Sequence, residues 1–198
     1  MKLILASKSP RRATILRNAG IRFETCGAAE IDESPLPGET AEQTALRLAE
    51  AKARQGAARM SGPAIVIGAD TIVVVDGETL GKPASAEDAR RMLRRLAGRT
   101  HRVVTGVAAM RLPDGASLHG AEVTEVSFAL LSDRDIDAYV ATREPLGKAG
   151  AYAIQGRGGR FITRIAGCYF NVVGLPLARL CKMLRDLGWQ QEPGTGTE

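Results

Sequence analysis

The chain has 198 residues, of which 44% are hydrophobic and 25% are charged. This composition fits one globular domain with a substantial core, and it fits neither a disordered chain nor a membrane protein. The net charge of +5 suits a phosphorylated ligand or a nucleic acid, but aromatic residues make up only 4% of the chain, too few for the stacking surfaces that bind single strands.

In chain order, the pattern of apolar residues first predicts a strand over residues 3–6, a helix over 10–20, a helix over 40–60 and a strand over 64–75. It next predicts a helix over 85–97, strands over 101–112 and 118–131, and a helix over 132–141. Further strands over 161–173 and a helix over 175–187 complete the chain. Alternating strands and helices are typical of an α/β domain. We expect a single domain over residues 1–189. The polar stretch 190–198 (QQEPGTGTE) is expected to be a disordered tail.

Local signals mark several of these boundaries. Ser9 and Pro10 are typical of a helix start, and Thr40 with Gln43 forms a capping box. The pair Asp76-Gly77 predicts a tight hairpin turn.

Nothing in the sequence directs the chain to a membrane or out of the cell. The longest apolar runs fall well short of the roughly 18 to 20 residues that span a bilayer, and the apolar start is shorter than the core of a signal peptide. We therefore expect a cytoplasmic protein with no membrane partner. The three cysteines, Cys26, Cys168 and Cys181, are widely separated, which predicts reduced thiols rather than disulfides or a zinc site.

The first segment with chemical potential is Ser7–Arg12 (SKSPRR), between the first strand and the first helix. The N–H groups and dipole at a helix N-terminus attract anions, and arginine suits bidentate contacts with phosphate. The alternative is a capped surface helix with two solvated arginines.

Acidic residues occur at two further places. Asp70, followed by Thr71, lies in the apolar segment AIVIGADT, and Asp32-Glu33 lies in the loop before the long helix. An aspartate in such a position can hold Mg²⁺ or accept a proton from water, and nearby carboxylates would complete an oxygen-rich site. The alternatives are a turn aspartate and a solvated acidic loop.

The remaining candidates are two lysines and one long loop. Lys52 falls on the apolar stripe of its helix, so it either reaches outward to solvent or meets a buried anion. Lys82 is held by the following Pro83. The glycine-rich loop 144–156 contains Gln155, an amide able to read a base edge, although a plain surface loop is the alternative. We interpret a run of helical arginines as a solvated face rather than a nucleic-acid surface: Arg90, Arg91, Arg94, Arg95 and Arg99.

Taken in order, several motifs resemble the Maf family of septum-formation-inhibitor-like nucleoside triphosphate pyrophosphatases. They are LASKSPRR, IDE, AEAKA, IVIGADTIV, GKP, LAGRTHRVVTGV, EPLGKAGAYAIQG and GCYFNVVGLP, and they extend from Leu3 to about Leu187. The resemblance implies an α/β fold with an elongated mixed sheet, flanking helices and a central cleft, similar to inosine triphosphatase. It also implies hydrolysis between the α- and β-phosphates of a nucleotide, a divalent cation (Mg²⁺ or Mn²⁺) and a homodimer.

The same resemblance assigns roles to individual residues. Asp70 matches the catalytic base, and Glu33 with Asp70 matches the metal ligands. The matching phosphate contacts are Ser9, Arg12, Lys52 and Lys82. The specificity positions Arg11, Thr71 and Gln155 match the branch that acts on dTTP and UTP, whereas the branch that acts on 7-methyl-GTP has Glu in place of the Gln.

Two positions depart from the family pattern: Gly147 replaces the usual Asp and Ala153 the usual Gly. The first removes a carboxylate near the substrate and leaves the metal to Glu33 and Asp70. The alternatives to a dTTP and UTP pyrophosphatase are an enzyme for another modified nucleotide, such as 7-methyl-GTP, and a non-enzymatic regulator of cell division or nucleic-acid-binding protein. The acids among the basic motifs argue against a nucleic-acid partner.

Overall fold

The computed structural model describes residues 1–27 and 31–190, so most of the expected disordered tail lies outside the described residues. The strands are β1 (Lys2–Leu5), β2 (Glu24–Thr25), β3 (Ala64–Val75), β4 (Glu78–Leu80), β5 (Thr100–Leu112), β6 (Ser117–Phe128) and β7 (Ile162–Ala166). The helices are α1 (Pro10–Asn18), α2 (Ala41–Ala57), α3 (Ala86–Leu96), α4 (Asp133–Ala141), α5 (Tyr169–Val173) and α6 (Leu177–Asp186). Short 3₁₀ helices cover Ala149–Ala151 and Arg157–Phe161.

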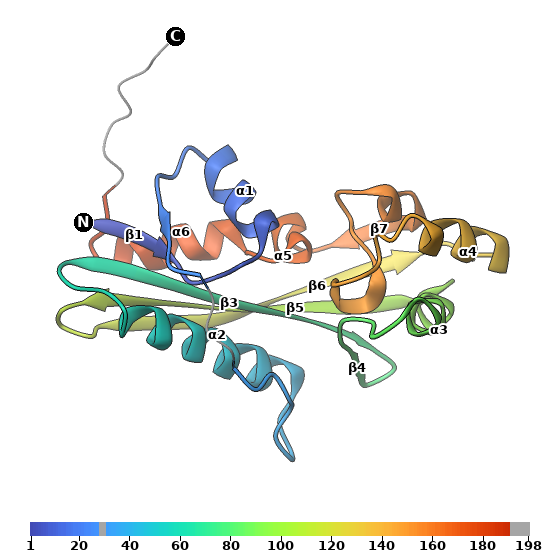
Figure 1. Ribbon diagram of the computed structural model, residues 1–198, viewed down its shortest axis with the longest axis horizontal. Helices are drawn as coiled ribbons and strands as arrows, with labels where there is room; N and C mark the ends of the chain where they lie inside the picture. The colour runs from blue at the N-terminus through green and yellow to red at the C-terminus, as the bar shows by residue number, and fades with distance from the viewer. Residues whose placement is uncertain (28–30, 191–198) are drawn as a thin grey trace, which may run out of the picture.

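One mixed sheet organises the chain. Its strand order is β2-β1-β3-β5-β6-β7, and β4 pairs with β3. β1 runs parallel to β2 and β3, and the other pairs are antiparallel. In Figure 1 the sheet is long and narrow, with α2 on one side and α1, α5 and α6 on the other. The expected α/β class and elongated mixed sheet are confirmed.

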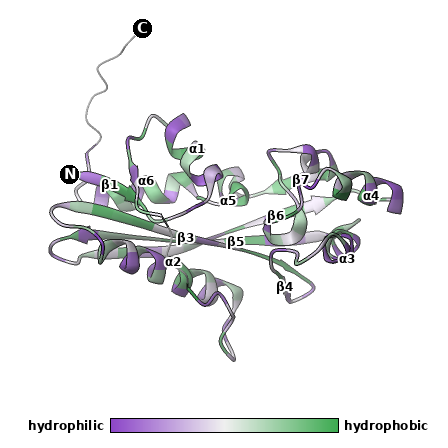
Figure 2. Cartoon of the chain, viewed as in Figure 1, coloured by the Kyte–Doolittle hydropathy of each residue, from purple (hydrophilic) through white to green (hydrophobic). Residues whose placement is uncertain are grey.

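Two apolar clusters lie on the side of the sheet opposite α2. Ile65 and Ile67 of β3 pack with α1, α5 and α6, whereas Val73 and Val75 of the same strand pack with α3 and α4. Because side chains alternate along a strand, Thr71 points to this same side, between the two clusters. Figure 2 shows the hydrophobic colour concentrated along the strands and the hydrophilic colour on α4.

The edge of β3 is open between those clusters. β1 pairs with residues 64–67 of β3 and β4 with residues 73–75, while β5 covers the opposite edge throughout. Residues 68–72 therefore have no strand on this side within the described ranges. Asp70 and Thr71 lie in that gap and point to opposite faces of the sheet, so a ligand at the open edge can meet both.

Two glycines allow α2 to approach the sheet at this point. A Cβ on Gly68 would lie 2.1 Å from the carbonyl oxygen of Ala49, and a Cβ on Gly106 would lie 2.2 Å from that of Ala45. Gly106 is the register partner of Asp70. The missing side chains thus let the backbone of α2 contact β3 and β5 directly, which brings Lys52 within reach of Asp70.

Most predicted boundaries are confirmed. The capping box of Thr40 and Gln43 is present, and Asp76 and Gly77 both have positive φ, as the tight turn requires. The predicted strands over 161–173 are partly wrong, because only Ile162–Ala166 is a strand and Tyr169–Val173 is the helix α5. Within residues 1–27 and 31–190, no helix is long and apolar enough to cross a membrane.

Candidate active site

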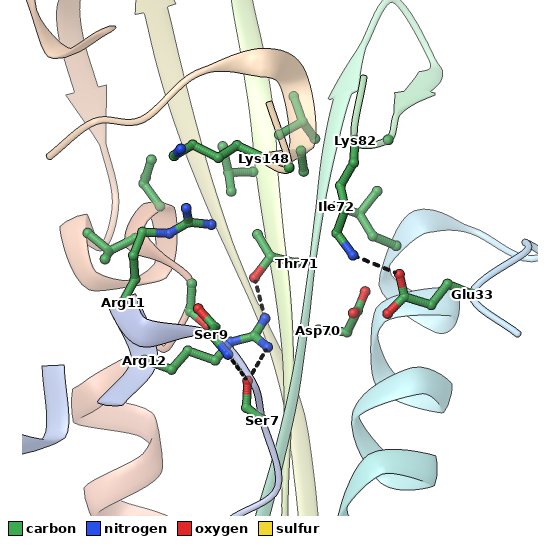
Figure 3. A pocket seen from close by; sticks show the side chains of 18 of the residues that line it. Ser7, Ser9, Arg11, Arg12, Glu33, Asp70, Thr71, Ile72, Lys82 and Lys148 are labelled. Carbon is green, nitrogen blue, oxygen red and sulfur yellow. Dashed lines mark hydrogen bonds and ion pairs between the residues drawn. The ribbon is translucent and has the colours of Figure 1, made fainter. Parts of the chain in front are cut away.

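A cleft of about 710 Å³ opens at the free edge of β3, and it brings together every site residue predicted from the sequence. Those residues are Ser9, Arg11, Arg12, Glu33, Lys52, Asp70, Thr71, Lys82 and Gln155. They come from α1, α2, β3 and four loops, so the fold joins segments far apart in the sequence. Figure 3 shows the cations of α1 on one side of Asp70 and Thr71, and Glu33 with Lys82 on the other.

Arg12 is a buried cation that has only neutral partners among the described residues. Its Nε donates to the carbonyl oxygen of Gly174 at 2.7 Å, Nη1 donates to Oγ of Ser7 at 3.2 Å, and Nη2 donates to Oγ1 of Thr71 at 3.1 Å. Burial lowers the pKa of Arg12, while the charge of Asp70 opposes this shift. A fixed guanidinium without a carboxylate partner is well suited to bind an anion.

Arg11 and Lys148 extend this positive surface. Both line the cleft, and in Figure 3 both side chains lie on the side of Arg12. Burial lowers the pKa of Arg11, and the pKa of Lys148 is lowered by burial and by the nearby charge of Arg11. No carboxylate lies within ion-pair distance of either cation in residues 1–27 and 31–190. The charge of Arg11 lowers the pKa of Lys148 because like charges repel, and a bound phosphate would relieve that repulsion.

The opposite side of the cleft holds a row of alternating charges. The ammonium of Lys52 donates to Oδ1 of Asp70 at 2.6 Å and to Oε1 of Glu33 at 2.7 Å. Lys82 donates to the second oxygen of Glu33 at 3.1 Å. Partial burial works against the Glu33 carboxylate, but the two lysines outweigh it and lower its pKa. Lys52 is therefore not extended to solvent: it meets a buried anion, the second of the two alternatives that its position left open.

Glu33 and Asp70 fit a divalent cation that is shared with a substrate. Both carboxylates converge on one positive charge, the Lys52 ammonium, so their oxygens already point to a common place. Among the described residues no group of three or more His, Cys, Asp or Glu side chains forms a complete metal cage. Mg²⁺ is commonly bound by one or two carboxylates together with phosphate oxygens, which matches a pair of this kind.

The loop after α4 supplies the third side of the cleft. Gln155 is exposed and lines the cavity, as does Gly147. Gly147 has φ of +74°, and nothing lies within 4 Å of the place where its Cβ would stand. There is thus open space, but a strained backbone, for the aspartate that the family usually has at this position.

Lys148 also lines the cleft, although no role was predicted for it from the sequence. Its position within the motif EPLGKAG was the signal that could have identified it. The predicted helix start at Ser9 and Pro10 is confirmed. The structure shows Ser9 at the N-cap with no side-chain cap bond, and its N–H donates to Oγ of Ser7 at 3.1 Å. Ser7 thus holds both the helix start and Arg12, and the hydroxyl of Ser9 is left to face the cleft.

Asp32 and the arginines of α3 do not line this cleft in the part of the chain that the structure describes. Asp32 accepts the N–H of Ser34 at 2.9 Å, away from Glu33's partners. The arginines on and after α3 are paired with exposed acids, which confirms a solvated face: Arg90 with Asp137, Arg91 with Asp88, Arg94 with Asp133, Arg95 with Glu78 and Arg99 with Asp76. His101 is buried against Phe128 and Tyr152, does not line the cleft, and has a structural role.

Comparison with known proteins gives close relatives over the full length. A "dTTP/UTP pyrophosphatase" of Anaeromyxobacter dehalogenans is 49% identical and covers 96% of this chain and 98% of the relative. A protein of the same name from Symbiobacterium thermophilum is 51% identical and covers 95% of each chain. Among solved structures, the Staphylococcus aureus Ham1 protein is similar with a TM-score of 0.43 and 16% identity, over 65% of this chain and 72% of that one. Residues 2–187 match the model of a protein family described as "Maf-like protein", and the chain therefore belongs to the Maf family.

Proposed function

We propose that this protein is a nucleoside triphosphate pyrophosphatase that hydrolyses dTTP and UTP to the monophosphate and pyrophosphate. One observation carries the proposal: the cleft has buried or half-buried cations on one side, without an ion-pair partner among the described residues, and two converging carboxylates on the other. Relatives of about half-identical sequence that bear the name dTTP/UTP pyrophosphatase support the choice of substrate.

The cations account for binding of the triphosphate. A nucleoside triphosphate carries about four negative charges, and the cleft offers a matching group of positive side chains: Lys8, Arg11, Arg12, Lys52, Lys82 and Lys148. Positioning and charge neutralisation are the main requirements of phosphoryl chemistry, and fixed charges supply both. Ser9, Arg12, Lys52 and Lys82 are the contacts that we assign to the phosphates.

We assign the role of general base to Asp70. Its carboxylate lies in the gap along β3, hydrogen-bonded to Lys52, and it would orient a water molecule and accept its proton as the water attacks the α-phosphorus. Glu33 and Asp70 would hold a divalent cation together with phosphate oxygens, and that cation would neutralise charge on the leaving pyrophosphate. Lys52 would then release one or both carboxylates and turn to the phosphates.

We assign base selection to Gln155, together with Arg11 and Thr71. A glutamine side chain offers one acceptor and two donors, which match the carbonyl and N–H edge shared by uracil and thymine. Thr71 accepts from Arg12 at 3.1 Å and exchanges a hydrogen bond with Thr105 at 2.9 Å, so its contribution to base selection would be indirect, through the side chains that it holds. We further expect the protein to act in the cytoplasm as a homodimer.

The test is a panel of canonical and modified nucleotides, incubated with Mg²⁺ or Mn²⁺, with separate detection of pyrophosphate and orthophosphate. We expect pyrophosphate from dTTP and UTP, and little from purine nucleotides. Orthophosphate release would show that a different bond is cut. A preference for 7-methyl-GTP would move the protein to the other branch, and no turnover of any nucleotide would leave the regulator as the better interpretation.

A further inference from the structure

The carboxylate of Glu144 is bound by hydrogen-bond donors of the protein itself, unlike that of a solvated surface glutamate. Glu144 precedes the loop that lines the cleft, and its carboxylate accepts from three donors at once. These are the hydroxyl of Tyr139 at 2.8 Å, the N–H of Arg157 at 3.0 Å and the N–H of Gly158 at 3.1 Å. Both carboxylate oxygens are therefore engaged by the far end of the loop that begins at this residue.

Tyr139 of α4 binds the same loop through its hydroxyl group. Its side chain is fully buried and packs edge-on against Phe161, with ring centroids 5.2 Å apart. Besides donating to Glu144, its hydroxyl accepts the N–H of Ala153 at 3.1 Å. The backbone is thus fixed at Ala153 on one side of Gln155 and at residues 157 and 158 on the other. Gln155 lies at the middle of a short arch that is held at both ends.

Two glycines make this close contact physically feasible. A Cβ on Gly156 would lie 2.5 Å from the Glu144 carboxylate, and a Cβ on Gly158 would lie 2.6 Å from the hydroxyl of Tyr139. Any side chain at either position would push the arch away from the residues that hold it. At the near end of the loop, the ammonium of Lys148 donates to the backbone carbonyl of Glu144, so both ends of the loop depend on one residue.

These hydrogen bonds favour the ionised form of the Glu144 carboxyl group. Partial burial opposes ionisation, but the N–H of Arg157, the hydroxyl of Tyr139 and the N–H of Gly158 together lower the pKa of the carboxyl group. Glu144 is therefore an anion at neutral pH, and its carboxylate acts only as a hydrogen-bond acceptor.

We propose that Glu144 and Tyr139 are positioning residues for nucleobase selection, because they fix the arch that presents Gln155 to the cleft. The inference rests on the proposed function, since it assigns a support to the residue that selects the base. Neither side chain needs to touch the substrate. Loosening the arch should therefore reduce discrimination between bases more than it reduces the turnover number.

The test uses Glu144→Gln and Tyr139→Phe in the full-length protein. Glu144→Gln keeps the shape but replaces one acceptor with an NH₂ group that faces N–H donors, and Tyr139→Phe removes the hydroxyl from both of its bonds. Glu87→Gln is the matched control, because Glu87 is exposed on α3 and pairs only with Arg90 and Arg94. Two quantities are measured: hydrogen–deuterium exchange of residues 153–158 without nucleotide, and kcat and KM for dTTP and GTP.

We expect exchange in residues 153–158 to be about tenfold faster in both variants, the factor that corresponds to one lost hydrogen bond. The ratio of kcat/KM for dTTP to that for GTP should fall by a similar factor, mainly through KM for dTTP, and Glu87→Gln should change neither quantity. Unchanged exchange, or faster exchange with an unchanged ratio, would overturn the inference. If the unmodified protein hydrolyses no nucleotide, the proposed function is wrong, and the part of the inference that concerns base selection is wrong with it. The exchange measurement is independent of that outcome and decides whether Glu144 and Tyr139 hold the arch.

Discussion

The two sides of the cleft hold their charges in opposite ways. On the α1 side, Arg12 is bound to two hydroxyls and a carbonyl, and no carboxylate of the described residues forms an ion pair with it. On the α2 side, Lys52 and Lys82 are already joined to Glu33 and Asp70. One side has uncompensated charge fixed by neutral groups, and the other has charge that is internally balanced.

Under the proposed function, we interpret this difference as a division of labour. A buried cation without a counter-ion is costly, and an incoming phosphate would offset that cost, so we propose that the α1 side supplies affinity for any triphosphate. The balanced side gains little from an anion until its ion pairs open. When they open, two carboxylates become available for water and for a divalent cation, while the lysines become available for phosphate. Binding is thus prepared on one side and chemistry on the other.

The largest effect should come from the balanced side, through Asp70→Asn. This change keeps the shape but removes the proposed base and one metal ligand, so kcat for dTTP should fall by roughly 10²- to 10⁴-fold. Lys52 keeps Glu33 as a partner at 2.7 Å, and the unfolding temperature should change little. Steady-state kinetics and a thermal melt check both points. Activity within about tenfold of the unmodified protein would move the base to Glu33.

The second prediction tests the unpaired side through Arg12→Ala. The loss of a charge-assisted phosphate contact is worth on the order of 1.5 to 3 kcal/mol, so KM should rise by up to about a hundredfold. Since phosphate is common to all substrates, dTTP, UTP and a guanine nucleotide should be affected alike. A change confined to one base would contradict the assignment of this side to phosphate. Arg17→Ala, further along the same helix and outside the cleft, is the control.

The edge of the base is read by Gln155, on the loop that supplies the third side of the cleft, and Gln155→Glu should show this. The variant loses two donors and gains a charge, so kcat/KM for dTTP should fall by about tenfold or somewhat more, the worth of one or two hydrogen bonds. A guanine nucleotide, which offers N–H groups, should lose little or gain. Equal losses on every nucleotide would mean that Gln155 does not read the base.

The sequence predicts these elements well where the signal is local. The capping box at Thr40 and the turn at Asp76 depend on neighbouring residues only, and both are present. The prediction is wrong for Tyr169–Val173, a helix whose apolar residues suit a strand equally well. Its conformation depends on Asn171, a buried residue whose amide donates to the carbonyl of Val103 at 2.9 Å and to Thr124 at 2.9 Å, both on distant strands. No local pattern reports such partners.

The same distinction applies to the cleft. The chemistry-bearing residue types could be selected from the sequence, because Arg12, Glu33 and Asp70 occur in recognisable motifs. Their pairing could not. Whether Lys52 meets solvent or two carboxylates depends on how closely α2 approaches β3, and that approach depends on the missing side chain of Gly68, whose Cβ would lie 2.1 Å from Ala49. Likewise, only the fold reveals that Lys148 joins Arg11.

The smallest effect concerns Gly147, and it tests whether the division between the two sides is complete. Gly147→Asp places a carboxylate on the cationic loop, where the cavity has room for it but φ of +74° strains any L-residue by about 1 kcal/mol. Gly147→Ala imposes the same strain without the charge, so the comparison of the two variants isolates the carboxylate. If the new carboxylate assists the cation that Glu33 and Asp70 are proposed to hold, the Mg²⁺ concentration for half-maximal activity should be about fivefold lower in the Asp variant than in the Ala variant. This factor corresponds to roughly 1 kcal/mol, the interaction of two unit charges about 4 Å apart in water. Equal Mg²⁺ requirements would show that the cation is served by the α2 side alone, and that the division is strict in this protein.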